Sequence, residues 1–296
     1  MSKLLICLMG LSLGVSAADL NEVLKGRGIW WKNPAKVQDS LIKKLQDMGM
    51  RRVHIMLTDT PTVVSKCSLA TLPKPSSTVN QLKTLTHTLQ QKNMYIIATV
   101  YLPPTKAAVN ALLDPDSGPV PALIVKGIDA IELDLEGDWK LHPPCGYTSH
   151  IAAFQDFKDR VKSIKQDMPV GITTHTSHIG EIEIPLAAAD YVSLQAYSKC
   201  PASNCKAFDN YTGPGKFQKY SIGKMKNLKI PIVLGLAAYR QTWPGHTLDE
   251  AMRLALNATT GIMATDSRVL GYSYWSTSTI IKTNEAYEFL MKEAAK

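Results

Sequence analysis

Long apolar runs are scarce in this 296-residue sequence. After the first 17 residues no segment is apolar enough to cross a bilayer, so we expect no stable membrane insertion. Low-complexity and strongly charged stretches are also missing, which excludes collagen-like and largely disordered classes. No stripe of Arg and Lys alternates with aromatic residues, so we expect no nucleic-acid partner. The composition, 45% hydrophobic and 20% charged, is typical of a globular protein.

The first residues carry an export signal. Lys3 precedes a short apolar stretch over residues 4–15, and the small residues Val15-Ser16-Ala17 follow it. This pattern predicts a signal peptide over residues 1–17 that is cut after Ala17. The alternative is an uncleaved anchor. We therefore expect a secreted or periplasmic protein whose mature part is residues 18–296. The net charge of +8 is scattered and suits acidic cell envelopes.

Cysteines are few, and their number is informative. Four remain after the signal peptide, and an even number in an exported chain predicts disulfides. The stretch CPASNC predicts a small loop closed by Cys200–Cys205, which leaves Cys67–Cys145 as the second bridge, although four cysteines allow three pairings. A zinc site is the alternative, but no paired His/Cys spacing supports it. We expect no metal and no cofactor.

Short apolar runs alternate with helical patterns along the whole chain. The spacing predicts eight strands, at residues 27–31, 52–58, 94–102, 128–136, 169–176, 190–198, 231–239 and 269–276. Helical spacing is found between them at 35–50, 77–93, 151–167 and 247–261, with a helix ending near 121–126, a short one at 184–189 and a last one at 285–295.

Eight strand–helix units in one chain indicate an α/β protein with a single (β/α)8 TIM-type barrel. A doubly wound open sheet is the alternative, but the first strand is not followed by a Gly-rich phosphate turn. No linker is apparent, so we expect one domain. Active sites of such barrels lie at the C-terminal ends of the strands. We therefore expect Trp31, Tyr101, His175 and Tyr239 to bind substrate there.

The stretch GIDAIELDLEG, residues 127–137, interrupts an apolar strand with acids at alternate positions. Side chains alternate between the faces of a strand, so Glu132, Asp134 and Glu136 should share the face that points into the barrel. Neighbouring acids on that face are about 6.6 Å apart along the strand. Glu136 should lie at the mouth, with Asp134 below it and Glu132 deepest.

Like charges stacked in a barrel interior cannot all ionise, because desolvation and mutual repulsion raise some of their pKa values. A carboxylic acid that stays protonated near neutral pH can act as a general acid, which suits protonation of a glycosidic oxygen. The alternative is a buried ion-pair network in which Lys or Arg from other strands neutralises the acids.

The acidic strand resembles the D-x-x-D-x-D-x-E signature of the family 18 glycoside hydrolases, the chitinase-like barrels. The matching residues are Asp129, Glu132, Asp134 and Glu136, with Glu132 where the family has Asp. Two further strand ends are similar to that family: Gln195 and Tyr197 in LQAYS, and Trp275 in GYSYWS. The Ser-x-Gly-Gly of the third strand is missing, and ATVYLPP stands there instead.

The resemblance implies a substrate-assisted mechanism, in which the sugar's own 2-acetamido group is the nucleophile. Glu136 would protonate the leaving oxygen. Asp134 would orient the acetamido N–H, and Tyr197 would contact the acetamido oxygen. Trp275 would form the apolar floor under the sugar, with Gln195 also contacting substrate. Glu132 would hold Asp134 through a shared proton.

LDLEG and YSYWS are also similar to strand ends of the family 25 muramidases, which implies peptidoglycan as the substrate. Glu136 would again be the acid, with Asp134 assisting. Both resemblances imply a polysaccharide of N-acetylated amino sugars as the partner. The alternative to an enzyme is a catalytically inactive, lectin-like barrel, although such proteins usually lose the terminal acid. The oligomeric state is left open.

Overall fold

The computed structural model describes residues 19–32, 34, 39–58, 63–65, 68–69, 78–197, 213–238, 246–282 and 284–296. The predicted signal peptide, residues 1–17, lies outside these residues, so it stays a prediction.

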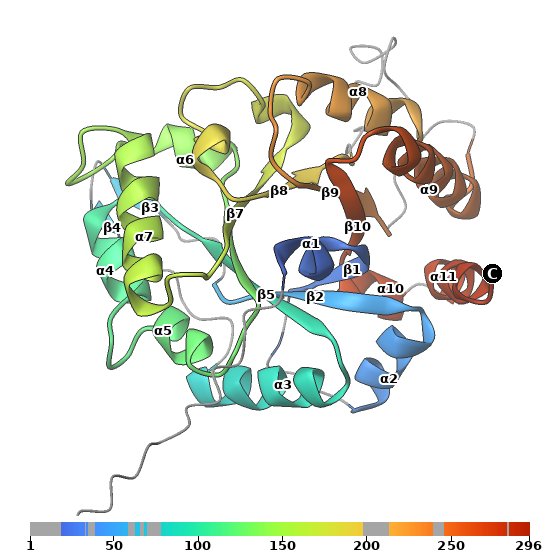
Figure 1. The fold of residues 1–296 in the computed structure, drawn as a ribbon, viewed down its shortest axis with the longest axis horizontal. Helices are drawn as coiled ribbons and strands as arrows, with labels where there is room; N and C mark the ends of the chain where they lie inside the picture. The colour runs from blue at the N-terminus through green and yellow to red at the C-terminus, as the bar shows by residue number, and fades with distance from the viewer. Residues whose placement is uncertain are drawn as a thin grey trace, which may run out of the picture.

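Eight parallel strands close into a barrel, which confirms the predicted (β/α)8 fold (Figure 1). Around the barrel each strand pairs with the next, and the first strand pairs with the last. The strands are β1 (Gly26–Trp31), β2 (Met50–Met56), β5 (Tyr95–Tyr101), β6 (Ala130–Asp134), β7 (Val170–His175), β8 (Val192–Gln195), β9 (Ile232–Ala237) and β10 (Val269–Trp275). A separate antiparallel pair, β3 (Val63–Ser65) and β4 (Ser68–Leu69), lies in the segment after β2.

Helices form an outer layer around the strands (Figure 1). They are α2 (Asp39–Asp47), α3 (Val79–Gln91), α4 (Lys106–Leu112), α5 (Pro119–Ile124), α6 (Gly137–Leu141), α7 (His150–Ile164), η1 (Thr176–His178), η2 (Leu186–Ala188), α8 (Lys216–Lys224), α9 (Leu248–Thr265), α10 (Thr277–Lys282) and α11 (Asn284–Ala294). A capping box begins α9, because Thr247 and Glu250 bond each other's backbone N–H.

The two faces of each strand have different surroundings. In β6 and just after it, Ile131, Leu133 and Leu135 belong to the large apolar core between strands and helices. Residues of the opposite phase line the barrel interior, where polar side chains dominate from Glu132 upward. A smaller apolar cluster fills the lower interior and includes Val23, Leu24, Ile97, Ala130, Tyr191 and Val233.

A short helix, α1 (Leu20–Leu24), lies across the barrel at the end where the strands begin (Figure 1). Its approach to β10 is so close that a Cβ on Gly271 would lie 2.3 Å from the carbonyl oxygen of Leu24. Higher in the interior, a Cβ on Gly171 would lie 2.4 Å from the ring of Tyr191. Glycines at these positions therefore make room for the helix and for a buried tyrosine.

Candidate active site

The three stacked acids lie as their alternation predicted. Glu132 is fully buried in the middle of β6, whereas Asp134, at the end of the strand, is partly exposed. Glu136, also partly exposed, follows the strand and is the N-cap residue of α6. The acids therefore run from the barrel centre to its C-terminal mouth.

Glu132 is held by donors from three other strands, β1, β2 and β5. Its Oε1 accepts from Trp30 Nε1 at 3.2 Å and from Thr99 Oγ1 at 3.2 Å, and lies 3.3 Å from His54 Nδ1. Burial alone would raise the pKa of Glu132, but His54, Ser193 and Trp30 outweigh burial and hold it below the usual value. Glu132 is therefore a buried carboxylate rather than a buried acid.

This arrangement corrects one expectation from the sequence. None of the hydrogen bonds among the described residues joins Glu132 to Asp134, so Glu132 does not hold Asp134 through a shared proton. Glu132 influences Asp134 through its charge instead. A glutamate is one methylene longer than the aspartate of the resembled family, and here its Oε1 meets donors on β1, β2 and β5.

Below His54 lies Arg52, a fully buried arginine. Its Nη1 donates to the carbonyls of Val23 and Leu24 at the C-terminal end of α1, at 3.1 and 2.6 Å. Burial lowers the pKa of Arg52 to about 10, so the guanidinium remains charged at neutral pH. Arg52 and Glu132 therefore lie on the two sides of one histidine and attract each other electrostatically.

At the mouth of the barrel, hydrogen bonds connect Asp134 and Glu136 to Gln195 on β8. Gln195 Nε2 donates to Glu136 Oε1 at 2.8 Å and lies 3.4 Å from Asp134 Oδ1. The hydroxyl of Tyr197 donates to Gln195 Oε1 at 3.0 Å. Four of the predicted residues, from β6 and β8, therefore form one hydrogen-bonded cluster.

Asp134 is the acid of this cluster whose pKa is raised. Burial raises its pKa well above the usual value, and the negative charges of Glu136 and Glu132 raise it further. Gln195 Nε2 reaches both carboxyl groups, so Asp134 and Glu136 face the same part of the barrel mouth.

His175, at the end of β7, positions the neighbouring tyrosine. Its Nδ1 accepts from the backbone N–H of Ser177 at 3.3 Å, so the ring proton is on Nε2, which donates to the carbonyl of Tyr197 at 3.0 Å. Burial lowers the pKa of His175, which favours this neutral form. Within the described contacts, His175 thus supports the strand end that carries Tyr197.

The tryptophan of β1 that faces the barrel interior is Trp30, and the expectation that Trp31 binds substrate there is wrong. Trp31 belongs with Ile29 to the core between strands and helices, so it does not face the barrel. Trp30 points inward instead, and its ring centroid lies 4.5 Å from that of His54 and 6.0 Å from that of Trp275. Trp275, the last residue of β10, is partly exposed, and its contact with a sugar stays a prediction.

Tyr101 alternates with Val100 and Leu102 of the outer core and therefore faces the barrel interior, where it is buried. Tyr239, Cys67, Cys200 and Cys205 lie outside the described residues, so their predicted roles stay predictions. Cys145 is disulfide-bonded, while its pairing with Cys67 stays a prediction.

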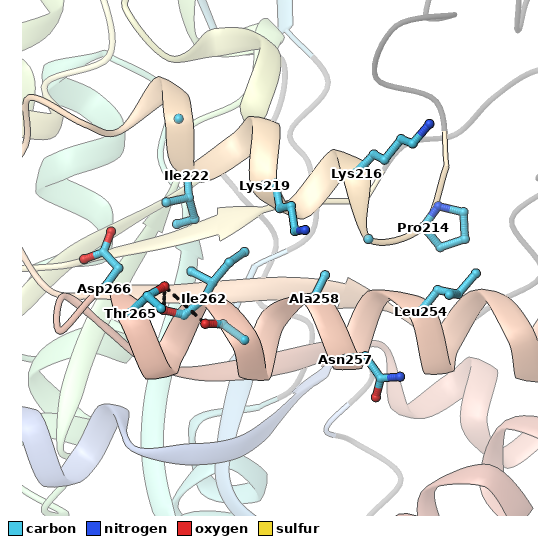
Figure 2. A pocket seen from close by; sticks show the side chains of 13 residues that line it. Pro214, Lys216, Lys219, Ile222, Leu254, Asn257, Ala258, Ile262, Thr265 and Asp266 are labelled. Atoms are coloured by element: carbon cyan, nitrogen blue, oxygen red, sulfur yellow. Dashed lines mark hydrogen bonds between the residues drawn. The ribbon is translucent and has the colours of Figure 1, made fainter.

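Among the described residues, no group of three or more His, Cys, Asp and Glu could hold a metal ion. In the same part of the chain, no helix is long and apolar enough to cross a membrane. A groove of about 870 Å³ lies on the outside of the barrel between α8 and α9, with Ile222, Leu254 and Ile262 among its lining residues and away from the acids (Figure 2).

The inward-facing polar residues that the sequence reading missed are Arg52 and His54 on β2, Thr99 on β5, Ser193 on β8 and Ser273 on β10. Their signal was available, because Arg52 and His54 alternate with the apolar Val53 and Ile55 just as the acids alternate in β6.

No family model and no curated protein matches this sequence. Solved structures are similar in fold. A GH18 chitinase from Pseudoalteromonas aurantia has a TM-score of 0.56 and 12% identity, and the match covers 91% of this chain and 99% of that one.

The GH113 β-mannanase of Alicyclobacillus acidocaldarius matches with a TM-score of 0.56 and 10% identity, over 92% of this chain and 96% of that one. A xylanase–α-amylase inhibitor protein in complex with trehalose matches with a TM-score of 0.53 and 13% identity, over 90% and 98%. At such low identity these likenesses show the barrel fold that glycoside hydrolases use, and no particular family.

Proposed function

We propose that the protein is an exported glycoside hydrolase that cleaves a polymer of N-acetylated amino sugars, either peptidoglycan or a chitin-like chain. The observation that carries this proposal is the cluster of Asp134, Glu136, Gln195 and Tyr197 at the C-terminal mouth of the barrel. It joins two carboxyl groups through one glutamine, and burial and neighbouring charge raise the pKa of one of them, Asp134. Barrel enzymes carry out their chemistry at this end.

In the proposed reaction Glu136 is the general acid. It protonates the glycosidic oxygen while the carbonyl oxygen of the 2-acetamido group attacks the anomeric carbon, which gives a cyclic oxazolinium ion and releases the leaving sugar. The proton held on Asp134 supplies Glu136 as the acid. Once ionised, Asp134 accepts from the acetamido N–H and stabilises the positive ring.

Water then completes the reaction. Glu136, now a carboxylate, takes a proton from the water as it adds to the anomeric carbon, and the ring reopens to the acetamido group. In this proposal the hydroxyl of Tyr197, which donates to Gln195 Oε1 in the structure, turns to the acetamido oxygen, and the partly exposed Trp275 packs against the sugar. Both residues thus serve binding of an N-acetylated ring in this proposal.

The substrate class rests on two supports. The acidic strand resembles a signature of chitinase-like barrels, and a chitinase is among the solved structures of similar fold. A mannanase is among them as well, so the fold leaves the sugar open and the acetamido mechanism is what distinguishes the candidates.

The test compares wild type with Glu136→Gln on purified peptidoglycan and on chitin oligomers, with the products identified by mass spectrometry. Glu288→Gln is the matched control, because Glu288 is exposed on α11. We expect wild type and the control to release fragments from one polymer and Glu136→Gln to release almost none. Equal cleavage by Glu136→Gln would refute the assignment of the acid.

A second candidate is a carbohydrate-binding barrel without catalysis. The observation that favours it is the hydrogen bond by which Gln195 already engages Glu136 at 2.8 Å, and an inhibitor protein in complex with trehalose shares the fold. If wild type releases nothing from either polymer and yet sediments with one of them, this candidate replaces the hydrolase.

A further inference from the structure

We propose that Arg52 and His54 form a buried charge relay, entering from the closed end of the barrel, that keeps Glu132 ionised and thereby leaves Asp134 as the acid that carries the proton. The relay is a property of the folded protein and can be measured without substrate. Its role in positioning the catalytic proton rests on the proposed function.

The hydrogen bond from Arg52 shows which ring nitrogen of His54 carries the proton. The Nε–H of Arg52 lies 3.1 Å from His54 Nε2, and a guanidinium can only donate. His54 Nε2 must therefore be the unprotonated ring nitrogen. The ring proton is then on Nδ1, which faces Glu132 Oε1 at 3.3 Å and donates to it.

Ser273 fixes the same tautomer from β10. Its Oγ accepts from Arg52 Nη2 at 3.0 Å, and its own proton is then free to point at His54 Nε2, which lies 2.9 Å away. Two donors therefore meet one ring nitrogen. Protonating that nitrogen would set N–H against N–H beside a cation, so His54 stays neutral. Burial lowers the pKa of His54 and outweighs Glu132, which raises it, and the charge of Arg52 lowers it further.

The groups that face Glu132 come from most strands of the barrel. The charged or titratable ones are Arg52 and His54 from β2, Asp134 and Glu136 above it on the same segment, and Tyr191 just before β8. The neutral donors are Trp30 from β1, Thr99 from β5 and Ser193 from β8. Among the described residues that face Glu132, Arg52 is thus the permanent cation.

The charge of Glu132 affects Asp134 at the mouth of the barrel. A carboxylate fixed below Asp134 repels a second negative charge, so the proton of the acidic stack stays on Asp134. It can then move outward to Glu136 and not inward to Glu132. Arg52 and His54 are therefore positioning residues, which act on the reacting groups through Glu132.

The first test uses wild type alone. With 15N-labelled histidine, long-range 1H–15N correlation should show His54 protonated on Nδ1, bare on Nε2 and unchanged between about pH 5 and pH 8. Carboxyl 13C shifts, assigned with Glu132→Gln and Asp134→Asn, should show Asp134 losing its proton at higher pH than Glu132. A protonated Nε2, or the reverse order of titration, would overturn the relay.

The second test compares His54→Leu with His54→Asn. Leucine removes the donor to Glu132, and we expect the pKa of Glu132 to rise by about one unit. Asparagine keeps an N–H near the position of Nδ1 and should recover much of that shift. If leucine does not fold, the asparagine variant and the wild-type tautomer still decide the question, whereas an unchanged Glu132 pKa in a folded His54→Leu refutes it.

The polymer assay separates this proposal from the proposed function. If wild type cleaves the polymer, the acid limb of its kcat/KM profile should move to higher pH in His54→Leu by the same amount as the Glu132 pKa, and return toward wild type in His54→Asn. If wild type cleaves nothing while the titration order and the tautomer hold, the relay stands and the hydrolase proposal fails.

Discussion

Replacing Arg52 by methionine gives the sharpest test of how the barrel interior is held together. The change removes a buried cation and keeps a side chain of similar length. Breaking one side of a buried ion pair typically destabilises a protein by about 3–5 kcal/mol, because the partner charge stays buried. The carbonyls of Val23 and Leu24 also lose their donor, although movement of α1 can expose them to water.

We therefore expect Arg52→Met to lower the free energy of unfolding by about 4 kcal/mol, in the middle of that range. For a chain of this size the melting temperature should fall by on the order of 10 °C. Urea unfolding followed by circular dichroism measures the loss. Arg51→Met is the matched control, because Arg51 is the exposed neighbour on the same strand, and it should leave stability nearly unchanged.

The pH dependence of this loss has a definite sign. The pKa of Glu132 is lowered in the folded protein, so its contribution to stability is present above its unfolded value and is lost as pH falls through the folded one. Without Arg52 the folded pKa of Glu132 rises, and the deficit of the variant should shrink below about pH 4.5. A loss under about 1 kcal/mol at neutral pH would refute the idea that Arg52 compensates Glu132.

Further outcomes follow from the same interior. Asp134→Asn should abolish cleavage yet raise the melting temperature at neutral pH. The pKa of Asp134 is raised in the folded protein, so the stability that it contributes at low pH is lost as pH rises through that value. Asparagine does not ionise, so the variant does not suffer this loss. Scanning calorimetry at pH 4 and pH 8 checks it, and an equal effect at both would contradict it. Gly171→Ala should destabilise by about 1–3 kcal/mol, because its Cβ would lie 2.4 Å from the buried Tyr191 ring. Gly223→Ala on α8, with open space around it, is the control and should not destabilise in the same denaturant titration. Oligomers of fully N-deacetylated sugars should remain intact in the mass-spectrometric assay, since they lack the acetamido nucleophile, and their cleavage would exclude the substrate-assisted mechanism.

The barrel and its acidic strand could be predicted because their patterns are unambiguous. In β6 the apolar Ile131, Leu133 and Leu135 alternate with acids, so only one face can point outward. Near the end of β1 the alternation gives no such guide, because Ile29, Trp30 and Trp31 are all apolar and all buried. The inward position of Trp30 is set by its partners on β2 and β10, which local sequence does not specify.

Contacts between residues far apart in the sequence could not be predicted from local residue spacing. Glu132 was expected to bond its neighbour two residues along, yet its donors come from other strands, among them His54 at a separation of 78 residues. The N-terminal helix α1 was missed because five residues carry too little periodic signal, although Asp19 caps it as a side-chain acceptor for Asn21.

The position of Arg52 also constrains the order in which the chain can fold. Its guanidinium bonds residues 28 or 29 positions before it and residues 220 and 221 positions after it. A growing chain that has not reached β10 therefore has no acceptors for Nη2 of Arg52. The guanidinium buried between the first strands then lacks two of its hydrogen bonds. Contacts this distant in sequence are slow to form, because the intervening loop must be closed before they stabilise anything. The N-terminal half should therefore stay open until the last strand arrives, a delay that would suit the proposed export of the chain.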